Sequence, residues 1–206
     1  MPRVVDHEQR RREIVDAVWR IASDRGLEGV SLGEVAAAAG FSKGLVQHYF
    51  RSRDEMLLYA AGELRTATQR RVAARLAGTA PTLRSILAAL LPTDAESRTD
   101  ALVASAFLIR ARSDAAIAQR FRQGQSQLRD VVAGMMVEAD DPERDADTVL
   151  ALVAGLSDGI LLGHHTVKRA LLLLDTYLER IVSQGSRVAR PASSRAMGTR
   201  KGEQET

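Results

Sequence analysis

The sequence contains no cysteine, and aromatic residues make up only 4% of its 206 residues. Without cysteine the chain can form neither disulfides nor thiolate metal sites. Alternating apolar and polar runs are also missing, as are Asn-Gly hairpin turns, so there is almost no signal for β-strands. These absences exclude a disulfide-stapled fold and argue against a sheet domain.

Long apolar runs are scarce as well. The most apolar stretch, residues 149–163, holds about fifteen residues and includes Asp158, whereas a membrane-spanning helix needs about 20 apolar residues. The start of the chain, MPRVVDHEQRRRE, is charged and lacks the apolar core of a signal peptide. We therefore expect a cytoplasmic protein with no membrane partner.

The net charge of +3 does not by itself predict nucleic-acid binding. Residues 1–60 carry nine basic and nine acidic side chains, and residues 61–186 carry fifteen of each. The basic excess lies in residues 187–206, where five basic side chains face two acidic ones. Any prediction of DNA binding must therefore rest on the local placement of charge.

Helical periodicity covers most of the chain. Apolar residues from Ile14 to Ala22 recur at helical spacing, and Gly26 ends that helix. Two Ser-x-x-Glu sequences, beginning at Ser31 and Ser52, have the spacing of capping boxes, in which each side chain bonds the other residue's amide. We expect an all-α fold of about nine helices, with those after the first at 32–39, 43–49, 53–78, 82–91, 96–112, 115–139, 143–162 and 167–184.

Residues 31–50, SLGEVAAAAGFSKGLVQHYF, have the pattern of a helix-turn-helix. Two helices of about two turns are separated by residues 40–42, a turn short enough to hold them at a steep angle. The second helix offers its free amino-terminal amides to a phosphate. On the same helix, Lys43 has the chemistry to bond guanine or phosphate, and Gln47 the chemistry to bond adenine.

This segment resembles the TetR family of transcription regulators. The resemblance covers about fifty consecutive residues and is closest to the betaine-synthesis repressor subgroup, although Gln47 stands where the family commonly has an aromatic residue. The remaining residues resemble the family only in length and helical layout. The matching motifs are GVS at 29–31, VAAAAGFSKG at 35–44, HYF at 48–50 and RDEMLL at 53–58.

The resemblance implies that the second helix and its flanks contact DNA. Lys43, Gly44 and Leu45 would face bases, which specify the sequence. Serine hydroxyls and an arginine at the start of the next helix would contact phosphates, which position the domain. The DNA-contact residues implied are Ser31, Ser42, Lys43, Gly44, Leu45, Gln47, His48, Tyr49 and Arg53.

Structural roles remain open for several of these residues. Both serines are helix caps whatever else they contact, Tyr49 is favoured as a core brace, and His48 could simply be solvated. The arginines of residues 10–12 would either grip a flanking groove or lie in solvent. The DNA-binding interpretation fails if Lys43, Gln47 and His48 point inward.

The last two predicted helices are too apolar for both to lie inside one chain. Apolar residues nearly surround the helix at 143–162, and the next helix has a similarly broad apolar face. A two-fold partner would supply the missing cover, which predicts a homodimer and a roughly palindromic operator. We expect the interface to contain Val149, Leu152, Val153, Leu156, Ile160, Leu171, Leu174 and Leu178.

The family resemblance also implies a small-molecule effector held among the sensor helices. Past residue 58 the sequence has only four aromatic residues, too few to favour the aromatic cage that a choline-like cation requires. Asp158 has three open roles: pairing across the dimer, bonding backbone, or meeting a cationic effector. The candidate pocket residues, for which plain core packing is the alternative, are Leu64, Phe107, Arg110, Phe121, Leu128 and Met135.

Other functions find little support. Zinc-protease, phosphate-loop, dinucleotide and nucleophile-elbow motifs are absent, so we expect neither an enzyme nor a bound cofactor or metal. A helical adaptor that binds protein through residues 31–50 is the other alternative. We predict a repressor with a DNA-binding domain at 1–52, a sensing and dimerisation domain at 53–185, and a disordered basic tail at 186–206.

Overall fold

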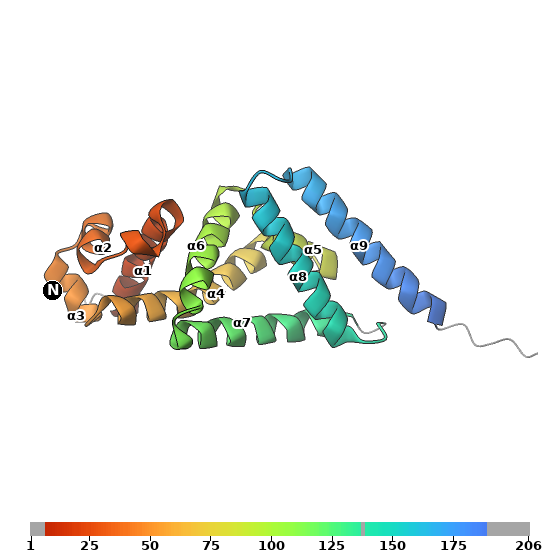
Figure 1. The fold of residues 1–206 in the computed structure, drawn as a ribbon, viewed down its shortest axis with the longest axis horizontal. Coiled ribbons are helices and arrows are strands. Elements are labelled where there is room, and N and C mark those ends of the chain that lie inside the picture. Colours follow the sequence, from red (N-terminus) through yellow and green to blue (C-terminus); the bar gives the residue numbers. More distant parts are fainter. Residues whose placement is uncertain (1–6, 137–138, 189–206) are drawn as a thin grey trace, which may run out of the picture.

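Figure 1 shows the fold in a computed structural model, which describes residues 7–136 and 139–188. This part of the chain contains nine α-helices, one short 3₁₀ helix and no strand, which confirms the predicted all-α class. Within it, no helix is long and apolar enough to cross a membrane. The elements are α1 (His7–Arg25), η1 (Leu27–Gly29), α2 (Leu32–Ala39), α3 (Lys43–Tyr49), α4 (Arg53–Arg75), α5 (Leu83–Leu90), α6 (Ala95–Ala111), α7 (Ala115–Gly134), α8 (Pro142–Leu161) and α9 (Val167–Val188).

The helices form two groups that α4 connects. In Figure 1, α1, α2 and α3 lie together at one end, and α8 and α9 lie at the other. The long helix α4 begins beside α3 and runs toward α5, while α6 and α7 lie between the two groups. A conformational change at one end of the molecule would therefore reach the other end through α4, α6 and α7.

A Schellman motif forms the turn between α2 and α3. Gly40 has a left-handed conformation, with φ 71° and ψ 28°. Its amide donates to the carbonyl of Ala37 at 3.3 Å, and the amide of Phe41 donates to the carbonyl of Ala36 at 2.9 Å. Glycine adopts this conformation without the strain that a Cβ would cause, so Gly40 sets the angle between the two helices.

Both predicted capping boxes form only in part. The hydroxyl oxygens of Ser31 and Ser52 each accept a hydrogen bond of 3.1 Å from the amide three residues later, as predicted. The return bonds predicted from the glutamates are wrong, because both carboxylates bond elsewhere. Glu34 pairs with Arg25 at 3.1 Å, and Glu55 accepts from the amide just before Ser52 at 2.8 Å.

An apolar core supports the helix-turn-helix. Val46 of α3 and Phe50 after it are fully buried in this core. The core does not stop at the end of α3, because Met56 of α4, Phe107 of α6 and Ile117 of α7 belong to the same cluster. The helix-turn-helix therefore packs directly on the elements that lead to the rest of the molecule.

A second apolar cluster lies among α5, α7, α8 and α9. It contains Leu87 and Leu91 from the α5 region and Val132 from α7, all with no exposed surface. One face of α8 and one face of α9 also belong to this cluster. Val149 on α8 and Leu174 on α9 have no exposed surface. This cluster fixes α8 and α9 to the remainder of the chain.

Three predicted helix ends differ from the structure. The helix α4 ends at Arg75 rather than near Gly78, and α7 ends at Gly134 rather than at 139, since glycine is a poor helix former. The last helix continues to Val188 instead of ending at 184, because no proline interrupts it there. The first residues of the predicted disordered tail are therefore helical, and residues 189–206 lie outside the described residues.

We expect Gly40→Ala to lower the free energy of unfolding by about 1 kcal/mol, because alanine is strained in the left-handed conformation. Urea denaturation measures this change. Gly44→Ala is the matched control, because an added Cβ meets no atom within 4 Å at either glycine, whereas only Gly40 has a positive φ. Equal stability of the two variants would contradict the role assigned to Gly40.

Candidate DNA-binding surface and sensor cavity

The helix α3 has a buried side and an exposed side. Val46 is fully buried, and Leu45 and Tyr49 are half-buried. Lys43 and Gln47 are exposed, as is His48, and neither ion pairs nor other helices cover them within the described chain. The exposed side therefore satisfies the condition on which the DNA-binding interpretation depends. Val46, which holds this helix in the core, was not among the residues predicted from the sequence.

The two serines at the helix starts are exposed caps. Ser42 accepts from the amide of Leu45 at 3.1 Å, in the same way that Ser31 caps α2. A hydroxyl that accepts one bond still has its hydrogen to donate. Both hydroxyls are thus able to donate to a phosphate while they cap, and that contact stays a prediction.

Tyr49 is held by neighbouring rings rather than being free in solvent. Its ring centroid lies 4.5 Å from that of His7 and 5.3 Å from that of His48, the latter in an edge-on arrangement. The ring is also packed against the amino-terminal core. This placement fits the brace that the sequence favoured and leaves Tyr49 at the border of the exposed surface.

Two of the three arginines near the start of α1, Arg10 and Arg11, pack on aromatic rings of the protein, whereas Arg12 is exposed. The guanidinium of Arg11 lies 5.1 Å from the centroid of the Phe50 ring and 4.7 Å from that of the Tyr59 ring, and it donates to the carbonyl of Tyr49 at 3.4 Å. Tyr59, the second of these rings, has a raised pKa because its hydroxyl is partly buried and lies near the carboxylates of Glu63 and Glu8. Arg11 therefore binds α1 to the end of α3 and to α4.

Arg53 has a bracing role in the structure, and its predicted contact with the DNA backbone stays a prediction. Its guanidinium donates to the carbonyls of Val30 at 2.7 Å and Leu27 at 2.6 Å. These bonds join the start of α4 to η1, the segment just before α2. Two of its donors are therefore used by the chain's own carbonyls, while the side chain remains 36% exposed.

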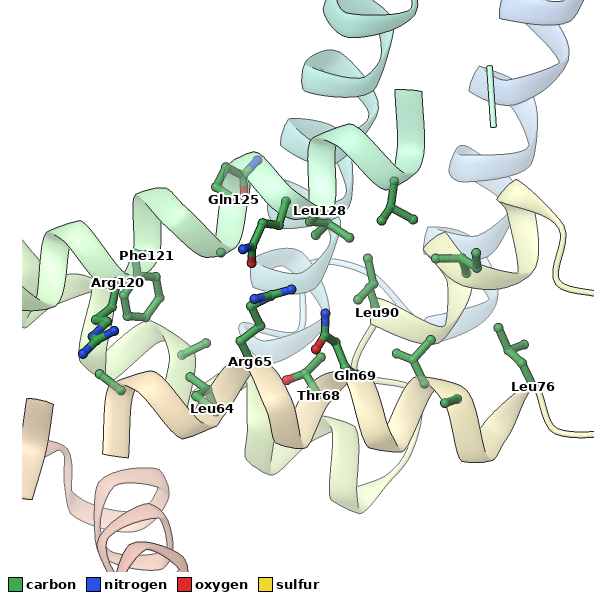
Figure 2. Close-up of a pocket in the computed structure, with 18 of the residues that line it drawn as sticks. Leu64, Arg65, Thr68, Gln69, Leu76, Leu90, Arg120, Phe121, Gln125 and Leu128 are labelled. Atoms are coloured by element: carbon green, nitrogen blue, oxygen red, sulfur yellow. The ribbon is translucent and has the colours of Figure 1, made fainter. Parts of the chain in front are cut away.

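A cavity of about 550 Å³ lies between α4, α5 and α7 (Figure 2). Three predicted pocket residues, Leu64, Phe121 and Leu128, line it. Apart from Leu64, the lining residues on α4 were not predicted. Their spacing of three and four residues places them on one face of that helix. The lining residues from α4 and its C-cap are Ala61, Leu64, Arg65, Thr68, Gln69, Val72, Ala73 and Leu76.

The other three predicted pocket residues lie elsewhere. Phe107 is fully buried in the amino-terminal core, where α6 packs on α1. Met135 follows the last turn of α7, beyond the cavity lining. Arg110 pairs with Asp54 at 3.4 Å and with Asp114 at 3.3 Å, so its charge bridges α6 to the first turn of α4.

The predicted dimer residues also require a correction. Val149, Val153, Leu156, Ile160 and Leu174 are at most 7% exposed, because they form the second core of a single chain. That side of each helix is therefore already covered. The remaining predicted residues, all half-buried, are Leu152, Leu171 and Leu178.

The exposed side of α8 and α9 is a different set of residues, which we call the open face. On α8 it includes the small residues Ala151, Ala154 and Gly155, followed by Leu162 just past the helix at 70% exposed. On α9 it includes Leu172, which is 53% exposed. Asp158 is also exposed, at the border of this face, where it lines a second cavity of about 300 Å³ with Arg71 of α4 and Asp100 of α6.

The described residues contain no group of three or more His, Asp or Glu side chains arranged to hold a metal ion. His164 and His165 lie in the turn between α8 and α9. The amide of His165 donates to the carbonyl of Gly159 at 3.0 Å, and a Cβ on that glycine would lie 2.6 Å from the imidazole. His165 thus packs the turn onto α8.

The helix α3 is the exposed second helix of a helix-turn-helix, and this arrangement is typical of helix-turn-helix DNA-binding proteins. Residues 14–60 match the family described as "Bacterial regulatory proteins, tetR family". Residues 79–183 match the "BetI-type transcriptional repressor, C-terminal" family. The chain belongs to the TetR family of transcriptional regulators, which confirms the predicted resemblance and its subgroup.

Individual relatives agree with this assignment. The chain is 30% identical over 186 residues to the HTH-type transcriptional regulator PksA of Bacillus subtilis, covering 84% of this chain and 91% of PksA. A transcriptional regulator of Rhodococcus sp. Rha1 has a similar crystal structure, with a TM-score of 0.76, 28% identity, and 84% and 96% of the two chains covered. Family and relatives are DNA-binding regulators and not enzymes, as predicted.

A further solved structure shares the fold alone. It is a putative transcriptional regulator from Saccharomonospora viridis in complex with choline, with a TM-score of 0.73 and 22% identity. The match covers 84% of this chain and 96% of that one.

We expect Arg53→Met to lower the free energy of unfolding by about 1–2 kcal/mol, because it removes two charge-assisted bonds to the carbonyls of Leu27 and Val30. Urea denaturation measures the loss. The control is Arg51→Met at an exposed position nearby, which should change stability by less than about 0.5 kcal/mol. An Arg53→Met protein of unchanged stability but weakened DNA binding would contradict the bracing role and favour the predicted phosphate contact.

Proposed function

We propose that this protein is a repressor that binds a palindromic operator as a homodimer and leaves it when a small molecule fills the cavity beside α4. The observation that carries the proposal is the orientation of α3. Val46 and Phe50 hold one side of this segment in the core, while Lys43 and Gln47 are exposed on the other. A helix held this way presents an exposed side of suitable chemistry to the major groove.

The residues on this side differ in what they supply. Lys43 is the one lysine or arginine of α3, and it supplies charge for guanine or phosphate. Gln47 supplies a donor and an acceptor that match adenine. Gly44 is exposed, and a methyl group added there would have no atom within 4 Å, so nothing inside the chain requires a glycine at this position. Its small size instead leaves room for a nucleic-acid backbone or base edge.

The open face of α8 and α9 supports a homodimer. An apolar surface made of Leu162, Leu172 and small residues of α8 is unfavourable in water, and the small side chains let a second helix approach closely. A two-fold partner presenting the same face would cover it and would place two copies of α3 on one duplex. Asp158 would then lie at or near this interface.

The position of the cavity supports control by a ligand. Its walls include the second half of α4, whose first half is part of the helix-turn-helix core. A ligand that changes the position of α4 or α7 therefore also changes the support of α3. The similar fold that was solved with choline is a relative that holds a small molecule. Acting on DNA, the protein would function in the cytoplasm.

We expect Lys43→Ala to weaken operator binding by about tenfold, because it removes one charged contact to DNA. An operator selected from random DNA, followed by fluorescence anisotropy at fixed salt, gives the affinity. Arg122→Ala is the control, since it removes the same charge from exposed α7. Equal affinities of the two variants would refute this placement of the DNA-binding surface.

We expect the double substitution Leu162→Glu and Leu172→Glu to produce monomers, because it places charges in the proposed interface. Sedimentation at micromolar protein concentration measures the mass. Ile109→Glu is the control, since Ile109 is 67% exposed on α6 and lies outside the open face. A wild-type protein that sediments only as a monomer would overturn the proposed dimer.

A further inference from the structure

The charge of the cavity lining is all of one sign. Two arginines, Arg65 from α4 and Arg120 from α7, are among the residues that line it, and none of the lining residues is acidic. The other polar groups are neutral and come from one threonine and three glutamines. Most of the remaining lining is aliphatic, and Phe121 is its one aromatic residue.

Both arginines lie between α4 and α7. A Cβ on Gly124 of α7 would be 3.5 Å from Cδ of Arg65, and a Cβ on Gly62 of α4 would be 3.9 Å from Nε of Arg120. Each arginine therefore crosses a glycine of the opposite helix. Figure 2 shows Arg65 extending from α4 into the space that α7 borders, with Phe121 and Gln125 on the other side.

A third arginine in this region, Arg71, has a structural role and serves as a comparison. Arg71, also on α4, is paired with Asp100 at 2.7 Å and donates to the carbonyl of Ala89 at 3.0 Å. Its side chain is only 8% exposed. Arg65 and Arg120, by contrast, are exposed and form no ion pair with any carboxylate of the described chain, so their charges remain available to a ligand at the mouth of the cavity.

We propose that the cavity takes an anionic amphipathic molecule, with a carboxylate or similar head group attracted to the charges of Arg65 and Arg120 and an apolar body along the aliphatic walls. This inference rests on the proposed function, because it names the class of effector. Guanidinium groups pair with carboxylates through charge-assisted hydrogen bonds. The cavity volume of about 550 Å³ suits a small organic molecule.

The same lining disfavours a quaternary ammonium ligand. Cations such as choline are bound by several aromatic faces or by a carboxylate. This cavity has one aromatic ring, no lining carboxylate and two positive charges. We therefore expect no choline binding in this cavity, although a protein of similar fold was solved in complex with choline.

Isothermal titration of the full chain with four probes tests the proposal. The probes are octanoate, 1-octanol, octyltrimethylammonium and choline, the longer ones below their micelle-forming concentrations. We expect octanoate to bind about tenfold more tightly than octanol, and the two cations to show no binding. Tighter binding of either cation than of octanoate, or no measurable octanoate binding, overturns the proposal.

Matched variants locate the binding. Arg65→Gln with Arg120→Gln should weaken octanoate binding about tenfold and leave octanol binding unchanged. Arg70→Gln with Arg122→Gln is the control, because it removes the same charge from exposed positions of the same two helices outside the cavity. Equal octanoate affinity of the two double variants overturns the proposal. Circular dichroism verifies that each variant is folded.

A charge-reversed variant and an operator-binding measurement complete the test. Arg65→Glu with Arg120→Glu should bind octyltrimethylammonium in place of octanoate, and failure to change preference counts against the proposal. Anisotropy with the selected operator is measured on the same preparations. A protein that binds operator but prefers cations refutes this inference alone, whereas one that binds octanoate but no operator refutes the proposed function alone.

Discussion

One continuous helix belongs to both functional parts of this molecule, and the rest of the structure depends on it. The helix α4 has 23 residues and is about 35 Å long. Its first half contributes Met56, Leu57 and Ala60 to the core that supports α3. Its second half lines the cavity. Because a helix of this kind is stiff, the cavity and the helix-turn-helix cannot be positioned independently, which would give the proposed ligand and DNA a shared structural element.

Arginine side chains hold the parts around α4 together. Arg53 bonds two carbonyls of the η1 region, Arg11 crosses the ring of Phe50, and Arg20 donates to the carbonyl of Ala38 at the end of α2 at 2.7 Å. Guanidinium groups suit this task because their donors are rigidly arranged and weakly hydrated. As a result, much of the positive charge near the helix-turn-helix is used inside the protein. The proposed recognition of DNA therefore rests on Lys43 and the neutral groups of α3.

The sequence was sufficient to predict local structure where local chemistry decides it. Gly40 and the two serine caps act within a few residues of themselves, so the helix-turn-helix and its boundaries could be predicted. Arg53 could not, because its partners Leu27 and Val30 lie more than twenty residues earlier in the chain. A basic residue at the start of a helix has the same pattern whether it meets a phosphate or a carbonyl.

The sensor helices show the same limit more strongly. The breadth of the apolar faces of α8 and α9 is visible in the sequence, but which side meets the chain's own core is not. Val153 and Leu156 face that core, whereas Ala154 and Gly155 between them remain exposed. Likewise, Phe107 and Phe121 are equivalent in the sequence, yet only Phe121 reaches the cavity, because α6 turns Phe107 toward α1.

The cavity links the stability of the folded chain, and so the abundance of the protein, to ligand binding. Residues that line this open cavity of about 550 Å³ have no packing partners on the cavity side. Any molecule that binds there, and does not bind the unfolded chain, stabilises the fold by about 2.7 kcal/mol when its concentration is 100 times its Kd. Proteolysis acts on the unfolded fraction, so the abundance of this protein would rise with the supply of its own ligand.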